Sequence, residues 1–142
     1  MKDNSYLTAI TRKKLSAPAR WLKEQGLLKG RILDYGCGRG VDARLLGAVG
    51  WDPHWAPVRP RGKFDTAICI YVLNVVQPRT REFILANILG YLREGGKAYV
   101  AVRRDIKESY VSSKGTFQDV VFLDPPAVSI KKTRDFELYE IF

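Results

Sequence analysis

The chain has 142 residues, of which 46% are hydrophobic and 27% charged, a balance typical of one soluble globular domain. No apolar run is long enough to span a membrane, and the first residues lack a signal-peptide core, so we expect a cytoplasmic protein. Lys and Arg number 24 against 15 Asp and Glu, for a net charge of +9, which favours a nucleic acid partner, although a generally basic surface would have the same composition.

The N-terminal residues 1–29 predict a basic segment followed by a helix. Residues 8–14 are basic and have no clear periodicity. Ser16 is a typical helix cap, Pro18 suits the first turn, and Gly26 a helix end. The first strand is predicted at 31–34, where a core region spanning 30–105 begins.

A glycine-rich turn follows this strand. The strand ends in Asp34, and Gly36, Gly38 and Gly40 follow at alternate positions. Glycine allows the backbone to approach a ligand closely, and the amides after the strand could donate to that ligand. A tight turn without a ligand is the alternative, but such a turn needs one glycine at most.

The middle of the chain alternates between predicted helices and strands. A helix is predicted at 41–46, a strand at 48–51 and a loop with three prolines at 53–63. A strand at 66–72, opened by 64–65, is apolar on both faces, as in a central parallel strand. A helix from Pro78 to about Arg93, ended by Gly95 and Gly96, and a strand at 98–102 complete this part.

Residues 106–142 predict a C-terminal antiparallel hairpin. Its strands are expected at 116–123 and 136–142, joined by a connection that contains Pro125, Pro126, Lys131 and Lys132. The whole pattern predicts a single α/β domain with about six strands.

Polar residues close several of these strands. Asp52 follows the second strand, the stretch 71–74 ends the third, and the stretch 103–105 ends the fourth. In an open α/β sheet, ligands bind at the carboxyl ends of strands near the topological switch point. We therefore expect these ends and the glycine turn to share one crevice.

The spacing of the glycines excludes two nucleotide-binding motifs. A dinucleotide fingerprint needs a glycine five residues after Gly36, but Val41 stands there, and no Gly-Lys-Ser/Thr phosphate loop is present. Cys37 and Cys69 have no Cys or His neighbour at metal-ligand spacing, and His54 is the single histidine. We therefore expect free thiols and no metal site.

The chain instead resembles class I, Rossmann-like S-adenosylmethionine-dependent methyltransferases. The resemblance rests on ILDYGCGRG at 32–40, GWDP at 50–53, FDTA at 64–67, YVLNVV at 71–76 and YLREGGK at 91–97. The residues 8–12, Ser16, Pro18, 34–38 and 51–53 are also similar to small methyltransferase-like proteins associated with DNA phosphorothioation loci.

The resemblance implies S-adenosylmethionine as cofactor and assigns roles to individual residues. The methionine part would lie over the glycine turn, and Asp52 would accept both ribose hydroxyls. The implied cofactor-binding residues are Asp34, Gly36, Cys37, Gly38, Gly40, Asp52, Pro53, Ile70 and Tyr71. Catalytic candidates are Tyr71, Asn74, Arg103 and Asp105, and candidate substrate-binding residues are Arg12, Lys13, Arg103 and Arg104.

The chain departs from this family after the second strand. Only residues 53–63 separate Asp52 from the strand opened by Phe64, and a crossover helix alone needs about 10–12 residues. We therefore predict a minimal sheet that lacks the third strand. The loop 54–61 would then cover the adenine, with Trp55 a candidate for stacking.

A second motif, Asp124-Pro125-Pro126-Ala127, resembles the Asp-Pro-Pro-aromatic motif of amino-methyltransferases that act on adenine or cytosine. Its position late in the chain and the alanine in place of an aromatic residue favour a simple proline turn. The leading interpretation is a methyltransferase, monomeric or homodimeric, that acts on RNA or DNA. The alternatives are a small-molecule or protein acceptor, or a non-catalytic cofactor-binding accessory subunit.

Overall fold

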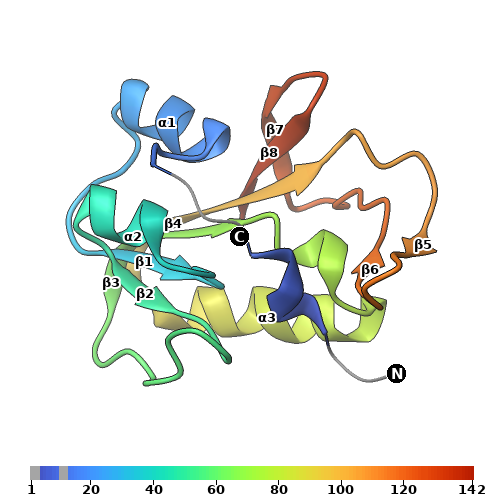
Figure 1. The fold of residues 1–142 in the computed structure, drawn as a ribbon. Coiled ribbons are helices and arrows are strands. Elements are labelled where there is room, and N and C mark those ends of the chain that lie inside the picture. Colours follow the sequence, from blue (N-terminus) through green and yellow to red (C-terminus); the bar gives the residue numbers. More distant parts are fainter. Residues whose placement is uncertain (1–3, 10–12) are drawn as a thin grey trace.

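The structure is a computed structural model that describes residues 4–9 and 13–142. Its centre is a six-stranded sheet in the order β2-β1-β3-β4-β8-β7, seen nearly edge-on in Figure 1. The strands are β1 Ile32–Tyr35, β2 Val49–Trp51, β3 Phe64–Ile70, β4 Leu92–Arg103, β7 Val128–Lys132 and β8 Phe136–Ile141. The first four are parallel, whereas β8 runs antiparallel between β4 and β7.

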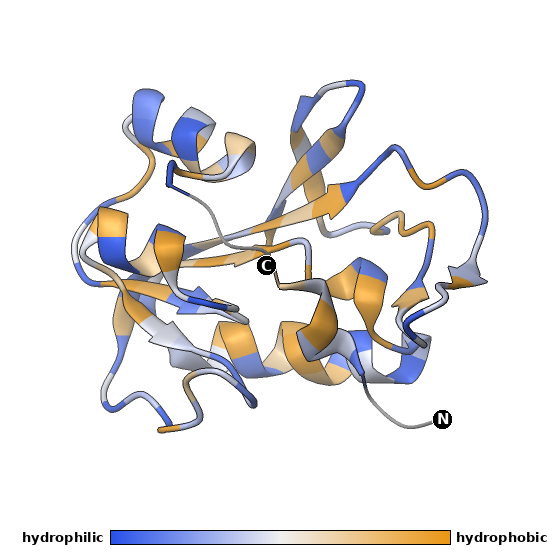
Figure 2. Cartoon of the chain, in the orientation of Figure 1, coloured by the Kyte–Doolittle hydropathy of each residue, from blue (hydrophilic) through white to orange (hydrophobic). Residues whose placement is uncertain are grey.

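Helices cover both faces of the sheet. α1 (Ala17–Glu24) and α2 (Val41–Leu46) lie on one face, and α3 (Pro78–Tyr91) lies on the other (Figure 1). Leu22 of α1 packs against Ile68 and Leu138, while Ile84 and Ile88 of α3 pack in the core cluster of the opposite face. Figure 2 shows the resulting mixture of hydrophobic and hydrophilic residues along the helices, with a hydrophilic tip on the β7–β8 hairpin.

The predicted α/β class, the six strands and the missing third strand are confirmed. β2 is an edge strand of the six-stranded sheet, and the segment after it forms a tight turn closed by a bridge between Asp52 and Ala56. Ser16 caps α1 as predicted, because its hydroxyl oxygen accepts from the Ala19 amide at 3.4 Å. The same serine donates from its amide and its hydroxyl to the Asp42 carboxylate, at 2.8 and 2.6 Å, and so ties α1 to α2.

The C-terminal antiparallel hairpin is confirmed and its second strand, predicted at 136–142, is β8, but the first strand, predicted at 116–123, was wrong. The partner of β8 is β7, which includes Lys131 and Lys132, and not the segment 116–123. Ile130 packs in the cluster beneath α1, and the Lys131 ammonium lies 5.8 Å from the centre of the Trp21 ring. The lysines therefore belong to an edge strand, where charged residues are common.

Residues 104–127 hold only a small hairpin, formed by β5 (Tyr110–Val111) and β6 (Phe117–Gln118). The predicted helix end at 93–96 also differs, because β4 begins directly after α3 at Leu92. The β3–β4 register shifts between Phe64 and Thr66, and an added Cβ on Gly96 would lie 3.1 Å from the Phe64 carbonyl oxygen. The two glycines thus fit an irregularity within the strand.

Two short 3-10 turns complete the fold near the carboxyl ends of the parallel strands. η1 comprises Ser5–Thr8 and η2 comprises Leu73–Val75, directly after β3. In the part of the chain that the structure describes, no helix has the length and apolar character needed to cross a membrane.

Candidate functional site

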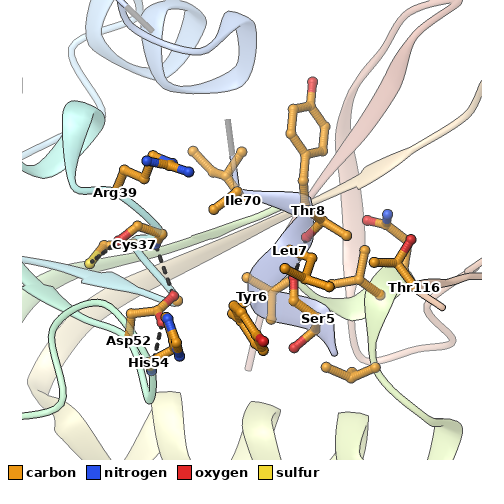
Figure 3. Close-up of a pocket in the computed structure, with 18 of the residues that line it drawn as sticks. Ser5, Tyr6, Leu7, Thr8, Cys37, Arg39, Asp52, His54, Ile70 and Thr116 are labelled. Carbon is orange, nitrogen blue, oxygen red and sulfur yellow. Dashed lines mark hydrogen bonds between the residues drawn. The ribbon is translucent and has the colours of Figure 1, made fainter. Parts of the chain in front are cut away.

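A cleft of about 1040 Å³ lies at the carboxyl ends of β1, β2, β3 and β4. Every residue that the sequence assigned to the cofactor lines it: Asp34, Gly36, Cys37, Gly38, Gly40, Asp52, Pro53, Ile70 and Tyr71. The catalytic candidates Asn74, Arg103 and Asp105 line it as well. In Figure 3, Cys37, Asp52 and His54 lie on one side of this cleft and Thr116 on the other, with η1 between them.

The glycine turn is held in place by its own backbone amides. Gly36 and Cys37 both donate to the Trp51 carbonyl, at 2.7 and 2.9 Å, and the Gly38 amide donates to Asp52 Oδ2 at 2.9 Å. Gly36, Gly38 and Gly40 have φ values of 77°, 55° and 83°, which side chains disfavour. The turn therefore needs its glycines, but its amides donate to Trp51 at the end of β2 and to Asp52 directly after it, and not to a ligand.

Asp52 anchors two turns at once. Besides Gly38, its carboxylate accepts from the amides of His54 and Trp55, at 2.9 and 3.0 Å. Its two oxygens offer about four lone-pair positions in total, and three of the corresponding hydrogen bonds are made within the protein. About one acceptor position is therefore left for a ribose, although Asp52 was predicted to accept both ribose hydroxyls. The sequence did not indicate this structural role of Asp52.

Cys37 lines the cleft beside two buried carboxylates. Burial, together with Asp34 and Asp52, raises the pKa of its thiol to about 12. Burial likewise raises the pKa of Cys69. Because a thiolate is the reactive form of cysteine, both side chains remain protonated near neutral pH and neither is suited to act as a nucleophile.

The N-terminal turn η1 crosses the mouth of the cleft. Tyr6 stacks on the His54 ring with centroids 4.0 Å apart, and its carbonyl accepts from Trp55 Nε1 at 3.3 Å. On the far side, Asn4 Nδ2 donates to the Gly115 carbonyl at 3.4 Å. No periodicity in the sequence predicted this turn, because a single turn of four residues is too short to show any; we call the η1 segment at the mouth of the cleft the strap.

The tryptophan proposed to stack on adenine points elsewhere. The Trp55 ring carries the Arg39 guanidinium at 4.4 Å from its centre, and Pro53 and His54 line the cleft at this turn, whereas Trp55 does not. To stack on adenine in the cleft, the Trp55 ring would therefore have to move away from Arg39 and into the cleft.

Arg103 and Asp105 neutralise each other at the end of β4. Two hydrogen bonds join the guanidinium to the carboxylate, at 2.8 and 2.6 Å. The hydrogen bond from Arg103 lowers the pKa of Asp105, and the reciprocal bond raises the pKa of Arg103. Asp105 is thus a weak base, and Arg103 presents little net charge to an anionic substrate.

The other predicted substrate-binding residues lie outside the cleft or outside the described residues. Arg104 donates from its guanidinium to the Thr133 carbonyl at the β7–β8 turn and is absent from the cleft lining. Lys13 is exposed beside a second hollow of about 460 Å³ that also touches Tyr71. Arg12 falls in the part of the chain that the structure does not describe.

The end of β3 places two unusual residues in the cleft wall. Tyr71 has a φ of 62°, a left-handed conformation that costs a non-glycine residue about 1–3 kcal/mol and is found most often at functional sites. Asn74 is fully buried and donates to Gln118 Oε1 at 3.2 Å, but its own Oδ1 has no hydrogen-bond partner. Gln118 comes from β6, a segment that sequence reasoning did not connect with the site.

No group of three His, Cys, Asp or Glu side chains suited to a metal ion occurs among residues 4–9 and 13–142. The cleft, at about 1040 Å³, is comparable in volume to small-molecule sites, most of which are concave and occupy about 300–1000 Å³.

Three proteins of known structure, two of them named as methyltransferases, have a similar fold. DhpI in complex with SAH aligns with a TM-score of 0.62 at 15% identity, covering 87% of this chain and 82% of that one. The chain has the fold of a class I methyltransferase. No protein-family model and no curated protein matches its sequence.

The two structures named as methyltransferases align with nearly all of this chain. The 1,6-didemethyltoxoflavin-N1-methyltransferase of Burkholderia thailandensis, with 1,6-didemethyltoxoflavin and S-adenosylhomocysteine bound, has a TM-score of 0.60 at 16% identity, covering 97% of this chain and 77% of that one. The glycopeptide N-methyltransferase MtfA has a TM-score of 0.55 at 10% identity, covering 97% and 95%. At these identities the likeness defines the methyltransferase fold and leaves the acceptor open.

Proposed function

We propose that the protein is an S-adenosylmethionine-dependent methyltransferase that acts on a small polar molecule. The observation that carries the proposal is the single cleft that gathers the glycine turn, Asp34, Asp52 and the ends of β3 and β4. In an open α/β sheet, this is the edge at which ligands bind. Two of the similar structures named above, at 15% and 16% identity, contain the demethylated cofactor, which supports the assignment.

The cleft fits this cofactor in size and in charge. Its volume of about 1040 Å³ lies at the upper end of the range for small-molecule sites, which is compatible with a cofactor and a small acceptor together. Asp34 and Asp52 are buried acids in its wall, which suit the cationic sulfonium and amino groups. An added Cβ on Gly40 would meet no atom within 4 Å, so the turn leaves open space at this point.

The bound cofactor would supply an electrophilic methyl group, and the protein would mainly orient the two reactants. The glycine turn and Asp52 form a fixed wall for the cofactor. The η1 strap lines the mouth of the cleft, and Ile70, Tyr71 and Asn74 line the same cleft at the end of β3. No residue of this site is required to form a covalent bond with the acceptor.

The walls of the cleft favour a small acceptor. η1 and the β5–β6 hairpin flank its mouth, and the predicted substrate-binding residues Arg103 and Arg104 are engaged within the protein. A second candidate, methylation of a nucleic acid, is favoured by the net charge of +9.

Isothermal calorimetry with S-adenosylhomocysteine tests the cofactor site. We expect saturable binding that is lost in Ile70→Trp, since a larger side chain there fills the cleft and leaves the hydrogen bonds of Asp52 in place. Phe142→Trp, at an exposed position outside the cleft, is the matched control and should bind normally. No binding of this ligand by the folded wild-type protein would contradict the proposal.

The acceptor class is tested separately. A nucleic acid acceptor predicts affinity for RNA or DNA that falls steeply as salt rises, together with transfer of a labelled methyl group to it. A small-molecule acceptor predicts transfer into the low-molecular-weight fraction of a cell extract. Cofactor binding without transfer to either fraction would instead favour the accessory subunit.

A further inference from the structure

The strongest unexplained feature of the cleft is the carbonyl oxygen of the Asn74 side chain. The residue is 0% exposed, yet Asn74 Oδ1 is one of two buried side-chain polar atoms without a partner among the described residues. An unpaired buried acceptor costs about 1–3 kcal/mol, so folded proteins rarely keep one. Because Asn74 also lines the cleft, a bound molecule can supply the missing donor.

Asn74 is held so that it cannot turn to a partner elsewhere. Its backbone carbonyl accepts from the Asp119 amide at 2.7 Å, and its side-chain nitrogen is fixed on Gln118. The turn that carries it is fastened by Arg81, which donates to the Leu73 and Val76 carbonyls at 2.9 and 3.3 Å and forms an ion pair with Asp119. The unpaired oxygen is therefore part of a rigid, preorganised wall.

The charge of the lining disfavours an anionic acceptor. Five of the described lining residues are aspartates and three are basic: Asp34, Asp42, Asp52, Asp105, Asp135, Arg39, Arg103 and Lys114. Asp105 already neutralises Arg103, and the Arg39 guanidinium lies over Trp55. Lys114 is the remaining basic residue of this lining, so carboxylates and phosphates would meet a wall in which acidic side chains outnumber basic ones.

We propose that Asn74 is a specificity-determining residue for a neutral amine acceptor, whose N–H donates to Asn74 Oδ1. The inference rests on the proposed methyltransferase function and names its substrate class. With one N–H held by Asn74, the nitrogen lone pair is oriented to form the new N–CH₃ bond as the C–S bond breaks and its electron pair stays on sulfur. The resulting ammonium then gives its proton to water.

The test uses aniline and toluene as probes on the protein loaded with S-adenosylhomocysteine. The two molecules have nearly the same shape, but aniline is a neutral N–H donor near neutral pH and toluene has none. We expect Asn74→Leu and Asn74→Ala to weaken aniline binding about tenfold relative to toluene, the value of one lost hydrogen bond. One substitution fills the space and the other leaves a cavity, so a shared loss identifies the hydrogen bond.

A measurement on the unmodified protein removes any dependence on how the variants fold. The side-chain amide resonance of Asn74 in ¹⁵N-labelled wild-type protein should shift with aniline and not with toluene. Equal shifts with both probes, no shift with aniline, or an unchanged aniline-to-toluene ratio in both variants would overturn the inference. Failure of S-adenosylhomocysteine to bind would overturn the proposed function instead, so the two outcomes are distinguishable.

Discussion

The two sides of the cleft are held together differently. On the side formed by β1 and β2, which we call the cofactor wall, backbone amides donate to the Trp51 carbonyl and the Asp52 carboxylate. On the opposite side, which we call the acceptor wall, side chains pair with each other: Arg81 with Asp119, and Asn74 with Gln118. The cofactor wall needs glycines and one carboxylate, while the acceptor wall depends on four particular polar side chains. The cofactor wall can thus be the same in enzymes with different acceptors, whereas the side chains of the acceptor wall can differ from one acceptor to another.

The largest effect is expected from Gly36→Ala in the cofactor wall. Gly36 has a φ of 77°, and an added Cβ would lie 2.5 Å from Val72 Cγ2. Left-handed strain and overpacking together should lower the free energy of unfolding by about 2–4 kcal/mol. Chemical denaturation followed by circular dichroism would measure this loss.

Gly40→Ala is the matched control for backbone strain alone. Gly40 has a φ of 83°, but its added Cβ meets no atom within 4 Å, so we expect a loss of only about 1 kcal/mol. Equal losses in the two variants would show that contact with Val72 does not contribute to the loss of stability, and that backbone strain alone accounts for it.

A smaller loss is expected when the acceptor wall is broken by Arg81→Met. The substitution keeps an apolar stem but removes the hydrogen bonds to the Leu73 and Val76 carbonyls and the ion pair with Asp119. The Arg81 and Asp119 side chains of this ion pair are only 15% and 14% exposed. We expect a loss of about 2–3 kcal/mol in the free energy of unfolding. The affinity for S-adenosylhomocysteine should stay within about twofold, because the cofactor wall is unaffected.

Lys97→Met provides the surface comparison, since the Lys97 side chain is 56% exposed and pairs with Glu140 at 3.3 Å. Exposed pairs contribute about 0–1 kcal/mol, so this variant should unfold close to the wild type. A large loss of affinity for S-adenosylhomocysteine in Arg81→Met would show that the cofactor wall and the acceptor wall are coupled and do not act as separate units.

The same division explains what could be predicted from the sequence. The glycine spacing and Asp52 are local signals, and the short segment after Asp52 predicted the missing strand correctly. Gln118 and Asp119 reach the site through contacts with residues about 40 positions away, for which a single sequence carries no pattern. The β7 strand was missed because Lys131 and Lys132 mask its alternation, and η1 because one turn has no periodicity.

The acceptor wall should also respond to acid through Asp119. Burial tends to raise the pKa of this carboxyl, but hydrogen bonds from Arg81 and Ser109 outweigh it and leave the pKa below the ordinary value. The stabilisation is therefore complete above the unfolded-state pKa of about 3.9 and is lost as the pH falls through the lower folded-state value. Asp119→Asn should be less stable than wild type by about 1–2 kcal/mol at neutral pH.

This difference between wild type and Asp119→Asn should shrink as denaturation is measured at successively lower pH below about 4. Asp135→Asn serves as the comparison, since the Asp135 side chain is 67% exposed beside Arg134 and is expected to change stability little. A stability gap for Asp119→Asn that stays constant down to the lowest pH would show that the Asp119 charge does not support the wall.

The smallest effect is expected where the two walls meet, at the strap formed by η1. Tyr6→Leu removes the ring that stacks on His54 at 4.0 Å but keeps the carbonyl that accepts from Trp55, so the loss should be about 0.5–1 kcal/mol. Tyr6→Phe keeps the stack and should match the wild type. The His54 ring proton resonances should move in Tyr6→Leu, because the ring current of Tyr6 is gone. Unchanged resonances would mean that the strap does not rest on the cofactor wall in solution, and that the cleft is open on this side.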